Sequence, residues 1–512
     1  MERIKKDMKV NDLKNELSDE KQLTENGALG YKTSGKNLLD ANFALSSMRR
    51  MSEDKIYNMF IKAYFDDKLL ALKWLFYARD IRGGCGERRT FRVILKGLAN
   101  DYPEIAKKLI KLVPEYGRWD DLWCLLDTDL KDDVFKFVEE SLRSDCDGMY
   151  KNKSVTLLAK WMPSANTSSK KTRELAKQFC DYLKLDKWQY SHMLKELRDY
   201  IDIVETKMSR NKWDKINYST VPSNANLLYK NAFLKHDEER RKEFLESVKN
   251  GESKINSSVL FAHDIVHKYT IQYLYSGFKT KKIDDTLEEL WKALPKLSDI
   301  NQETIVVRDD SGSMMCPVDS KSNLAALEIA TALSIYFSQY LTGEFKDKYI
   351  SFSHNPKFID LSNCNSLKEK LDISYAHSEV SDTDIYKTFM LILNTAIKNG
   401  YSQEEMPKNI LILSDMEFNS ATGYSTNKTL FDKISKKFEI NGLKMPRLIF
   451  WNLCSRTNTI PLKENDLGVA LVSGFSQNIL NMVLKGNLDP YLNLVEVLNT
   501  DRYNPVEEAL QE

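Results

Sequence analysis

An aspartate and two serines follow one another at the spacing Asp-x-Ser-x-Ser. Asp309, Ser311 and Ser313 come just after the β-branched run Ile305–Val307, which predicts a buried strand ending in a polar turn. A helical pattern follows over residues 323–340. A strand, an oxygen-rich turn and a helix form the usual layout of a ligand site at the carboxyl edge of a parallel sheet. One carboxylate and two hydroxyls in a single turn suit a hard divalent cation such as Mg²⁺.

This turn resembles the metal-ion-dependent adhesion site of von Willebrand factor A domains. That family takes a threonine from a second loop and an aspartate that follows a later strand. Thr383 precedes a helical pattern over residues 385–397, and Asp415 follows the buried-strand run 409–413. Both residues therefore fall where the family pattern requires them.

The resemblance implies a site for Mg²⁺ or Mn²⁺ and a role for each residue. Ser311, Ser313 and Thr383 would be direct ligands, and Asp309 and Asp415 would act more through water. Taken alone, the Asp-x-Ser-x-Ser spacing also fits a plain turn that caps a helix, because Asp, Ser and Gly are common in turns.

Arg308 departs from the family pattern, in which an apolar residue is commoner at this position. Its charge predicts one of two consequences. It either weakens metal binding or forms a salt bridge with Asp310.

Composition predicts a multidomain protein without a general attraction to polyanions. The 512 residues suggest two or three domains, and a net charge of +1 means that any basic site must be local. The seven cysteines include no Cys-x-x-Cys pair, which argues against a zinc ribbon and a secreted disulfide framework. Without a signal peptide or an apolar run of about twenty residues, the expected location is the cytoplasm, with no membrane contact.

The patterning predicts a helical domain followed by an α/β domain. Residues 1–36 are polar and predict a mobile arm. Residues 37–295 show amphipathic helices of about ten to twenty residues, which predict a HEAT-like helical repeat domain. Strands alternate with helices over residues 296–488, as in a doubly wound sheet of the von Willebrand factor A type, and 489–512 form a tail.

Five arginines flank a glycine-rich turn in the helical region. A helix start with exposed N–H groups attracts anions, and arginine adds bidentate phosphate contacts, so this cluster is a candidate for RNA binding. Internal pairing with Asp80 and Glu87 is an equally weighted alternative. The candidate residues are Arg79, Arg82, Arg88, Arg89 and Arg92.

Two further segments could contact RNA. Tyr116 and Trp119 could stack bases around Arg118, although packing between helices is the favoured interpretation of these aromatics. Near residue 170, a small-polar loop precedes a helix start that carries positive charges, and a capped helix is the alternative there. The candidates at that helix start are Lys170, Lys171 and Arg173.

Four stretches together resemble one family, which is filed as a domain of unknown function and occurs in plants, fungi, bacteria, phages and other large DNA viruses. They cover residues 75–84, 114–122, 160–164 and 309–314. The architecture is similar to that of Ro-type RNA-binding proteins, which join a helical-repeat ring (the TROVE module) to an A domain. That similarity implies binding of single-stranded or partly structured RNA.

We therefore expect a non-enzymatic RNA-binding scaffold that carries a metal-dependent docking site. The alternative is a protein-interaction adaptor in which the bound metal accepts a partner's carboxylate. An enzyme is disfavoured because the segment around Ser476 lacks the second glycine of a Gly-x-Ser-x-Gly elbow and the six histidines show no triad context.

Overall fold

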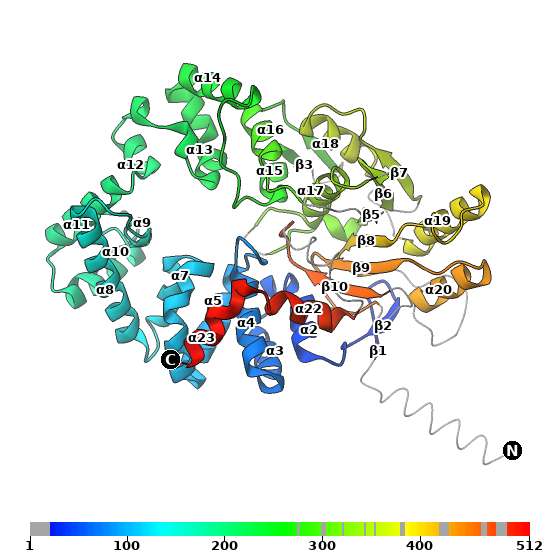
Figure 1. Cartoon of the computed structure of the whole chain (residues 1–512), viewed down its shortest axis with the longest axis horizontal. Coiled ribbons are helices and arrows are strands. Elements are labelled where there is room, and N and C mark those ends of the chain that lie inside the picture. Colours follow the sequence, from blue (N-terminus) through cyan, green and yellow to red (C-terminus); the bar gives the residue numbers. More distant parts are fainter. Residues whose placement is uncertain are drawn as a thin grey trace, which may run out of the picture. The chain divides into compact units, whose positions relative to one another are not determined.

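The computed structural model describes residues 21–511 apart from nine internal gaps, at 274–276, 298–303, 320–321, 343–344, 353–354, 379–383, 419–429, 462–467 and 478–488. The chain forms two compact units (Figure 1). The sheet unit comprises residues 1–71, 261–284 and 296–500, and the helical unit comprises 72–260, 285–295 and 501–512. The chain passes into the sheet unit after Pro295, where a domain boundary is expected, but residues 37–71 and 261–284, expected in the helical domain, also belong to the sheet unit.

The sheet unit is built on six strands in the order β10-β9-β8-β5-β6-β7. All neighbours are parallel except β7, which pairs antiparallel with β6. The strands β5, β8, β9 and β10 are buried along their whole length, so both faces of the sheet are covered there. The strands are β5 (Thr304–Asp309), β6 (Lys348–Phe352), β7 (Lys357–Asp360), β8 (Asn409–Ser414), β9 (Arg447–Asn452) and β10 (Val469–Ser473).

Helices alternate with these strands, as the sequence predicts. The apolar helix α17 packs against β5, β6 and β8, and α19 packs against β6 and α20. Residues 478–488, which follow β10, lie outside the described residues. The helices between and after the strands are α17 (Ala326–Ser338), α18 (Leu367–Ala376), α19 (Ile385–Asn399), α20 (Leu430–Ile440) and α22 (Pro490–Leu498).

The sheet unit also takes in segments from the first part of the chain. The strands β1 (Lys21–Leu23) and β2 (Leu29–Tyr31) form a hairpin, so residues 21–36 are not the mobile arm that their polarity predicts. The other added elements are α2 (Asn37–Phe43), α3 (Glu53–Asp66), α15 (Ala262–Tyr269) and the hairpin of β3 (Thr270–Tyr273) with β4 (Gly277–Thr280).

The helical unit contains consecutive helices that pack in pairs, such as α5 with α6, α10 with α11 and α13 with α14. Helices α11 and α12 are separated at Ile201–Ile203, where Asp202 has a φ of 56°. The elements are α4 (Lys68–Arg79), α5 (Arg88–Asp101), α6 (Pro103–Leu109), α7 (Val113–Tyr116), α8 (Lys131–Tyr150), α9 (Leu158–Trp161), α10 (Lys170–Leu183), α11 (Lys187–Tyr200), α12 (Val204–Ser209), α13 (Ser223–His236), α14 (Glu238–Lys249), α16 (Asp285–Lys292) and α23 (Asn504–Gln511).

The segment expected as a C-terminal tail contains the helices α22 and α23, and its last part, residues 501–512, belongs to the helical unit. Arg502 pairs with Asp80 (Nε–Oδ2, 2.9 Å) and with Glu115 (Nη1–Oε1, 2.7 Å). The Tyr116 hydroxyl donates to the Arg502 carbonyl at 2.6 Å, and α23 packs on α6. None of the helices described is long and apolar enough to span a bilayer.

Candidate metal centre

The candidate metal centre lies where three parallel strands end side by side. Asp309 is the last residue of β5, Asp415 follows β8, and residues 455–457 follow β9. The chain turns from β5 to one side of the sheet and later returns to the other side as β8. The pair β5–β8 is therefore the switch point of the sheet, where α/β folds bind ligands.

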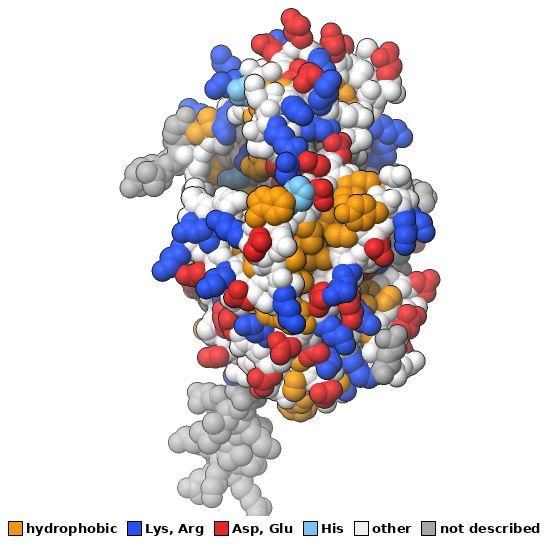
Figure 2. Space-filling model, turned by 90° about the vertical axis from the view of Figure 1, so that its left-hand side faces the viewer, with side chains coloured by type: hydrophobic (Ala, Val, Ile, Leu, Met, Phe, Trp, Pro, Cys, Tyr) orange, Lys and Arg blue, Asp and Glu red, His pale blue; other side chains and the backbone are white. Residues whose placement is uncertain are grey.

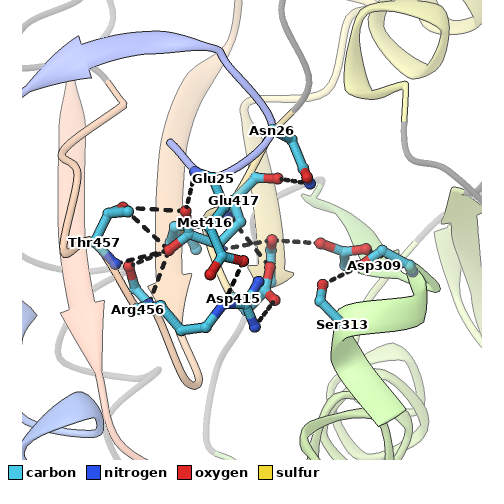
Figure 3. A network of polar contacts seen from close by, with 12 residues as sticks. Glu25, Asn26, Asp309, Ser313, Asp415, Met416, Glu417, Arg456 and Thr457 are labelled. Carbon is cyan, nitrogen blue, oxygen red and sulfur yellow. Dashed lines mark hydrogen bonds and ion pairs between the residues drawn. The ribbon is translucent and has the colours of Figure 1, made fainter. Parts of the chain in front are cut away.

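Asp309, Ser311 and Ser313 lie together at this edge (Figure 3). Asp309 Oδ1 accepts from the Ser311 backbone N–H at 2.9 Å, which closes the turn on the carboxylate. The hydroxyls of Ser311 and Ser313 lie 2.9 Å apart. The turn thus holds one carboxylate and two hydroxyl groups close together.

Asp415 reaches the same volume from the neighbouring strand. The Ser414 hydroxyl donates to Asp309 Oδ2 at 2.5 Å, which ties the two strand ends together. Met416, the residue after Asp415, has a φ of 63°, a left-handed conformation that is costly for a methionine and that sharpens the turn. The register of β5 with β8 therefore places the two carboxylates together.

Burial raises the pKa values of both carboxyl groups. Burial, followed by the negative charge of Asp415, raises the pKa of Asp309 to about 7. Burial is also the largest cause of the raised pKa of Asp415, and a hydrogen bond from Ser313 opposes it. Two buried acids this close are stable as anions only beside a compensating cation.

The donor set fits a hard divalent cation. Asp415 Oδ2 is buried and accepts no hydrogen bond from any residue that the structure describes, although the Arg456 guanidinium lies 3.4 Å from it. Among these residues no group of three His, Cys, Asp or Glu side chains could hold a metal, so the hydroxyls of Ser311 and Ser313 would have to complete the shell. The predicted ligand Thr383 lies outside the described residues.

Glu417 anchors the surroundings of the site and was not anticipated from the sequence. Its carboxylate accepts from the backbone N–H groups of Glu25 at 2.8 Å and of Arg456 and Thr457 at 2.8 and 2.9 Å (Figure 3). The Asn26 amide also donates to the Glu417 carbonyl at 2.6 Å. This buried residue fastens the β1–β2 turn and the loop after β9 beside the metal edge.

Arg456 is a positive charge built into the edge of the site. Its Nη1 lies 3.4 Å from Asp415 Oδ2, and its Nε donates to Glu25 Oε2 at 2.6 Å. The guanidinium therefore already neutralises part of the carboxylate charge that a metal ion would use. Neither Arg456 nor Glu25 carries a local sequence signal, since both reach the site through tertiary contacts, although Asn26-Gly27 is typical of a hairpin turn.

We expect Arg456→Gln to tighten Mg²⁺ binding, because it removes a like charge from beside the ion. A change of about ten-fold in the dissociation constant corresponds to a partly screened charge interaction of this kind. Isothermal titration calorimetry with MgCl₂ measures it, and Arg143→Gln, which removes an exposed arginine paired with Glu139, is the matched control. Weaker Mg²⁺ binding by Arg456→Gln would contradict the assigned role.

Arg308 forms the expected salt bridge with Asp310. Both side chains are fully buried, with Nε 2.8 Å from Oδ1 and Nη2 donating to Oδ2 at 2.9 Å. The guanidinium also donates to Thr331 Oγ1 at 3.1 Å and to the Ser374 carbonyl at 3.1 Å. Its charge is thus satisfied by Asp310 and held within the core of the sheet unit.

The arginines proposed for RNA are largely engaged inside the helical unit. Arg79 is buried and pairs with Asp121 (Nη2–Oδ2, 2.8 Å), so it is inaccessible to RNA, contrary to the sequence expectation. Arg92 Nε lies 2.7 Å from Asp121 Oδ1, and Arg88 pairs with both Asp120 and Asp121. These arginines are therefore paired internally, but with Asp120 and Asp121 and not with the expected Asp80 and Glu87.

The glycine-rich turn caps a helix and does not form an anion cradle. The N–H groups of Gly84 and Gly86 donate to the Asp80 carbonyl at 3.2 and 3.1 Å, and that of Glu87 donates to the Ala78 carbonyl at 2.7 Å. A Cβ on Gly84 would lie 2.0 Å from the Tyr77 carbonyl oxygen, so only glycine fits this close approach. The expectation of exposed N–H groups at this turn is wrong because helix carbonyls accept their hydrogen bonds.

The remaining candidates differ in exposure. Tyr116 and Trp119 are buried, as the packing interpretation predicts, and the Arg118 guanidinium stacks 4.8 Å over the Trp161 ring. Arg173 donates to the carbonyls of residues 167 and 168, both at 2.7 Å, and thereby caps its own loop. Lys170, Lys171, Arg82 and Arg173 are exposed, and Arg89 is half-buried.

Comparisons with known proteins place the chain among proteins of undefined activity. The family model described as a domain of unknown function, DUF2828, matches residues 24–140 and 129–304, and a second such model, DUF7788, matches 303–506. An uncharacterized protein of Acanthamoeba polyphaga mimivirus is 28% identical over 94% of this chain and 88% of its own length.

Two solved structures are distantly similar. The Ro (RSR) protein of Deinococcus radiodurans aligns over 87% of this chain and 99% of its own, with 13% identity and a TM-score of 0.45. Proximal thread matrix protein 1 of the mussel byssus aligns over 36% of this chain and 46% of its own, with 18% identity and a TM-score of 0.24. Scores this low bear on neither function nor ligand. On the match over residues 24–304, the chain belongs to the DUF2828 family.

Proposed function

We propose that this protein is a non-enzymatic scaffold whose sheet edge docks a partner carboxylate through a bound Mg²⁺ or Mn²⁺ ion. The observation that carries the proposal is the buried acceptor Asp415 Oδ2, which accepts no hydrogen bond from the described residues, next to a turn in which the hydroxyls of Ser311 and Ser313 lie 2.9 Å apart. Such a shell supplies too few protein oxygens to saturate an octahedral ion, so a position remains for an outside oxygen ligand.

The chemistry of the site favours binding over catalysis. In the part of the chain that the structure describes, the hydroxyls of Ser311, Ser313 and Ser414 contact one another or carboxylates, and a nucleophile would instead need a base such as histidine. The proposed ion neutralises Asp309 and Asp415, and Arg456 at the rim adds positive charge for an incoming anion. A partner's aspartate or glutamate matches this arrangement.

Arrayed peptides that present a single Asp or Glu in a neutral background test the docking function. We expect capture of a subset of peptides in MgCl₂, loss of that capture in EDTA, and no capture by Asp309→Ala. Peptides in which the acid is replaced by Asn or Gln are the matched control. Equal capture of acid and amide peptides would contradict docking through a metal.

RNA binding by the helical unit is a second candidate function. It is favoured by Lys170 and Lys171, which are exposed at the start of the fourteen-residue helix α10, although Lys170 lies within 3.8 Å of Glu174. The helix N-terminus and the two ammonium groups together attract phosphate. RNA is also the ligand that the Ro-type resemblance of the sequence implies.

We expect Lys170→Glu combined with Lys171→Glu to weaken RNA binding and to flatten its salt dependence. Every phosphate that the variant no longer neutralises should reduce the log–log salt slope by about 0.7 for a single strand. Fluorescence anisotropy with a labelled RNA measures both, and Lys436→Glu on α20, an exposed lysine of the sheet unit, is the control. The same slope in both variants would contradict phosphate binding at α10.

A further inference from the structure

The outer side of α11 carries aromatic side chains that neither proposed function uses. Trp188 is 71% exposed, and its ring lies 5.0 Å from that of His192 with an interplanar angle of 7°. Tyr200 is exposed two turns beyond His192, and residues four apart line one ridge of a helix. At the end of α8, which packs on α11, Tyr150 is 76% exposed.

The ridge is joined to the turn after α8. The Tyr200 hydroxyl donates to the Lys153 carbonyl at 2.7 Å, which fixes that ring against the turn that follows Tyr150. We call Trp188, His192, Tyr200 and Tyr150 the aromatic surface. Exposed rings held in place by stacking and hydrogen bonding lose little conformational entropy when a flat ligand stacks on them.

Exposed lysines surround the aromatic surface. Four of them are Lys153, Lys184, Lys187 and Lys195. None of these four forms an ion pair with any residue that the structure describes. The nearby acids have partners of their own, since Asp186 accepts from the N–H groups at the start of α11 and Glu196 lies 3.3 Å from His192 Nε2. The four lysines can therefore contact phosphates locally, although the net charge of the chain is only +1.

Figure 2 shows the face of the molecule that α8 to α12 form in Figure 1. Hydrophobic side chains gather near the middle of this face beside a histidine, and both basic and acidic side chains lie around them. Exposed rings with lysines nearby suit a ligand that has flat apolar faces and a negatively charged backbone.

We propose that the aromatic surface binds single-stranded nucleic acid. Bases would stack on Trp188 and the neighbouring rings, and Lys187 and Lys195 would hold the flanking phosphates. A duplex hides its base faces, so the surface should prefer single strands. This inference rests on the second candidate function, RNA binding, and gives it a site separate from Lys170 and Lys171.

The test is fluorescence anisotropy of the full chain with a labelled oligoadenylate of about twelve nucleotides. We expect Trp188→Ala to raise the dissociation constant about ten-fold or more, the range for removal of one base stack, and Trp188→Phe to raise it less. Phe65→Ala removes a ring of equal exposure, 71%, from the sheet unit and should leave binding unchanged. Lys187→Ala with Lys195→Ala should flatten the salt slope.

Each other outcome rejects a defined part of the inference. Oligoadenylate binding that Trp188→Ala leaves intact but Lys170→Glu with Lys171→Glu abolishes would overturn the aromatic surface and leave the RNA function standing. No binding by the wild type at low salt would overturn both. If Trp188→Ala lost heparin binding to the same extent as oligoadenylate binding, the ring would be needed to position the positive charges, and base stacking would be rejected. Capture of an acidic peptide, but no oligonucleotide, by this surface would assign it to a protein.

Discussion

Asp309→Ala is expected to weaken Mg²⁺ and Mn²⁺ binding by roughly 100-fold, the upper range for residues that orient a metal shell. The substitution removes the carboxylate that closes the turn on Ser311 and that Ser414 ties to the neighbouring strand. Calorimetric titration with MnCl₂ measures the loss directly. Thermal unfolding provides a second readout, because a ligand at one hundred times its dissociation constant stabilises the folded state by about 2.7 kcal/mol.

The same experiment separates loss of the metal site from loss of the fold. Without added metal, Asp309→Asn should unfold no earlier than the wild type, because it relieves the repulsion between two buried carboxylates. Asp360→Asn alters a carboxylate at the end of β7 in the same sheet and should retain Mn²⁺ binding. A wild type that shows no titration heat and no metal-dependent stabilisation would contradict the proposed metal site, and with it the docking function.

Asp121→Ala is expected to destabilise the helical unit by about 3–5 kcal/mol, the usual cost of breaking a buried ion pair. It leaves the buried Arg79 guanidinium without its carboxylate and removes one of the two carboxylates that pair with Arg92. The backbone at Gly117 packs directly against the Asp121 carboxylate, because a Cβ at this position would lie 2.6 Å from Asp121 Oδ2. Urea unfolding followed by tryptophan fluorescence measures the difference.

Two controls define this prediction. Asp127→Ala removes the carboxylate of an exposed pair with Lys96 and should cost about 1 kcal/mol or less. Burial alone would raise the pKa of Asp121, but the charges of Arg79 and Arg92 outweigh it and hold the pKa below its usual value. The stabilisation is therefore complete above the unfolded-state pKa of about 4 and is lost as pH falls through the lower folded-state pKa. An Asp121→Ala protein as stable as Asp127→Ala would contradict this account.

The buried Asp121 cluster also changes how RNA variants should be chosen. Reversing Arg88 and Arg92 to glutamate would set like charges against Asp120 and Asp121, so a loss of RNA binding could report unfolding. Substitutions at Lys170, Lys171 and Trp188, which are exposed, avoid that ambiguity.

Local sequence patterns were sufficient to predict the parallel strands of the six-stranded sheet, the main helices and the candidate metal turn, but not β7 or the hairpins β1–β2 and β3–β4. Runs such as Ile305–Val307 and residues 409–413 are apolar because parallel strands are buried on both faces, so their positions can be predicted locally. Asp309, Ser311 and Ser313 share one turn, and a turn of five residues brings its own side chains together without help from the rest of the chain.

The pairing of distant residues, in contrast, became visible only in the folded chain. The division into two units, the partners of Arg79 and the places of Glu25 and Arg456 depend on contacts between residues separated by tens to hundreds of positions. Charge patterning shows that an arginine needs a partner, but an ion pair between helices has no sequence period that would reveal which acid it is. The same reason explains why Asp121, not Asp80 or Glu87, binds the arginine cluster.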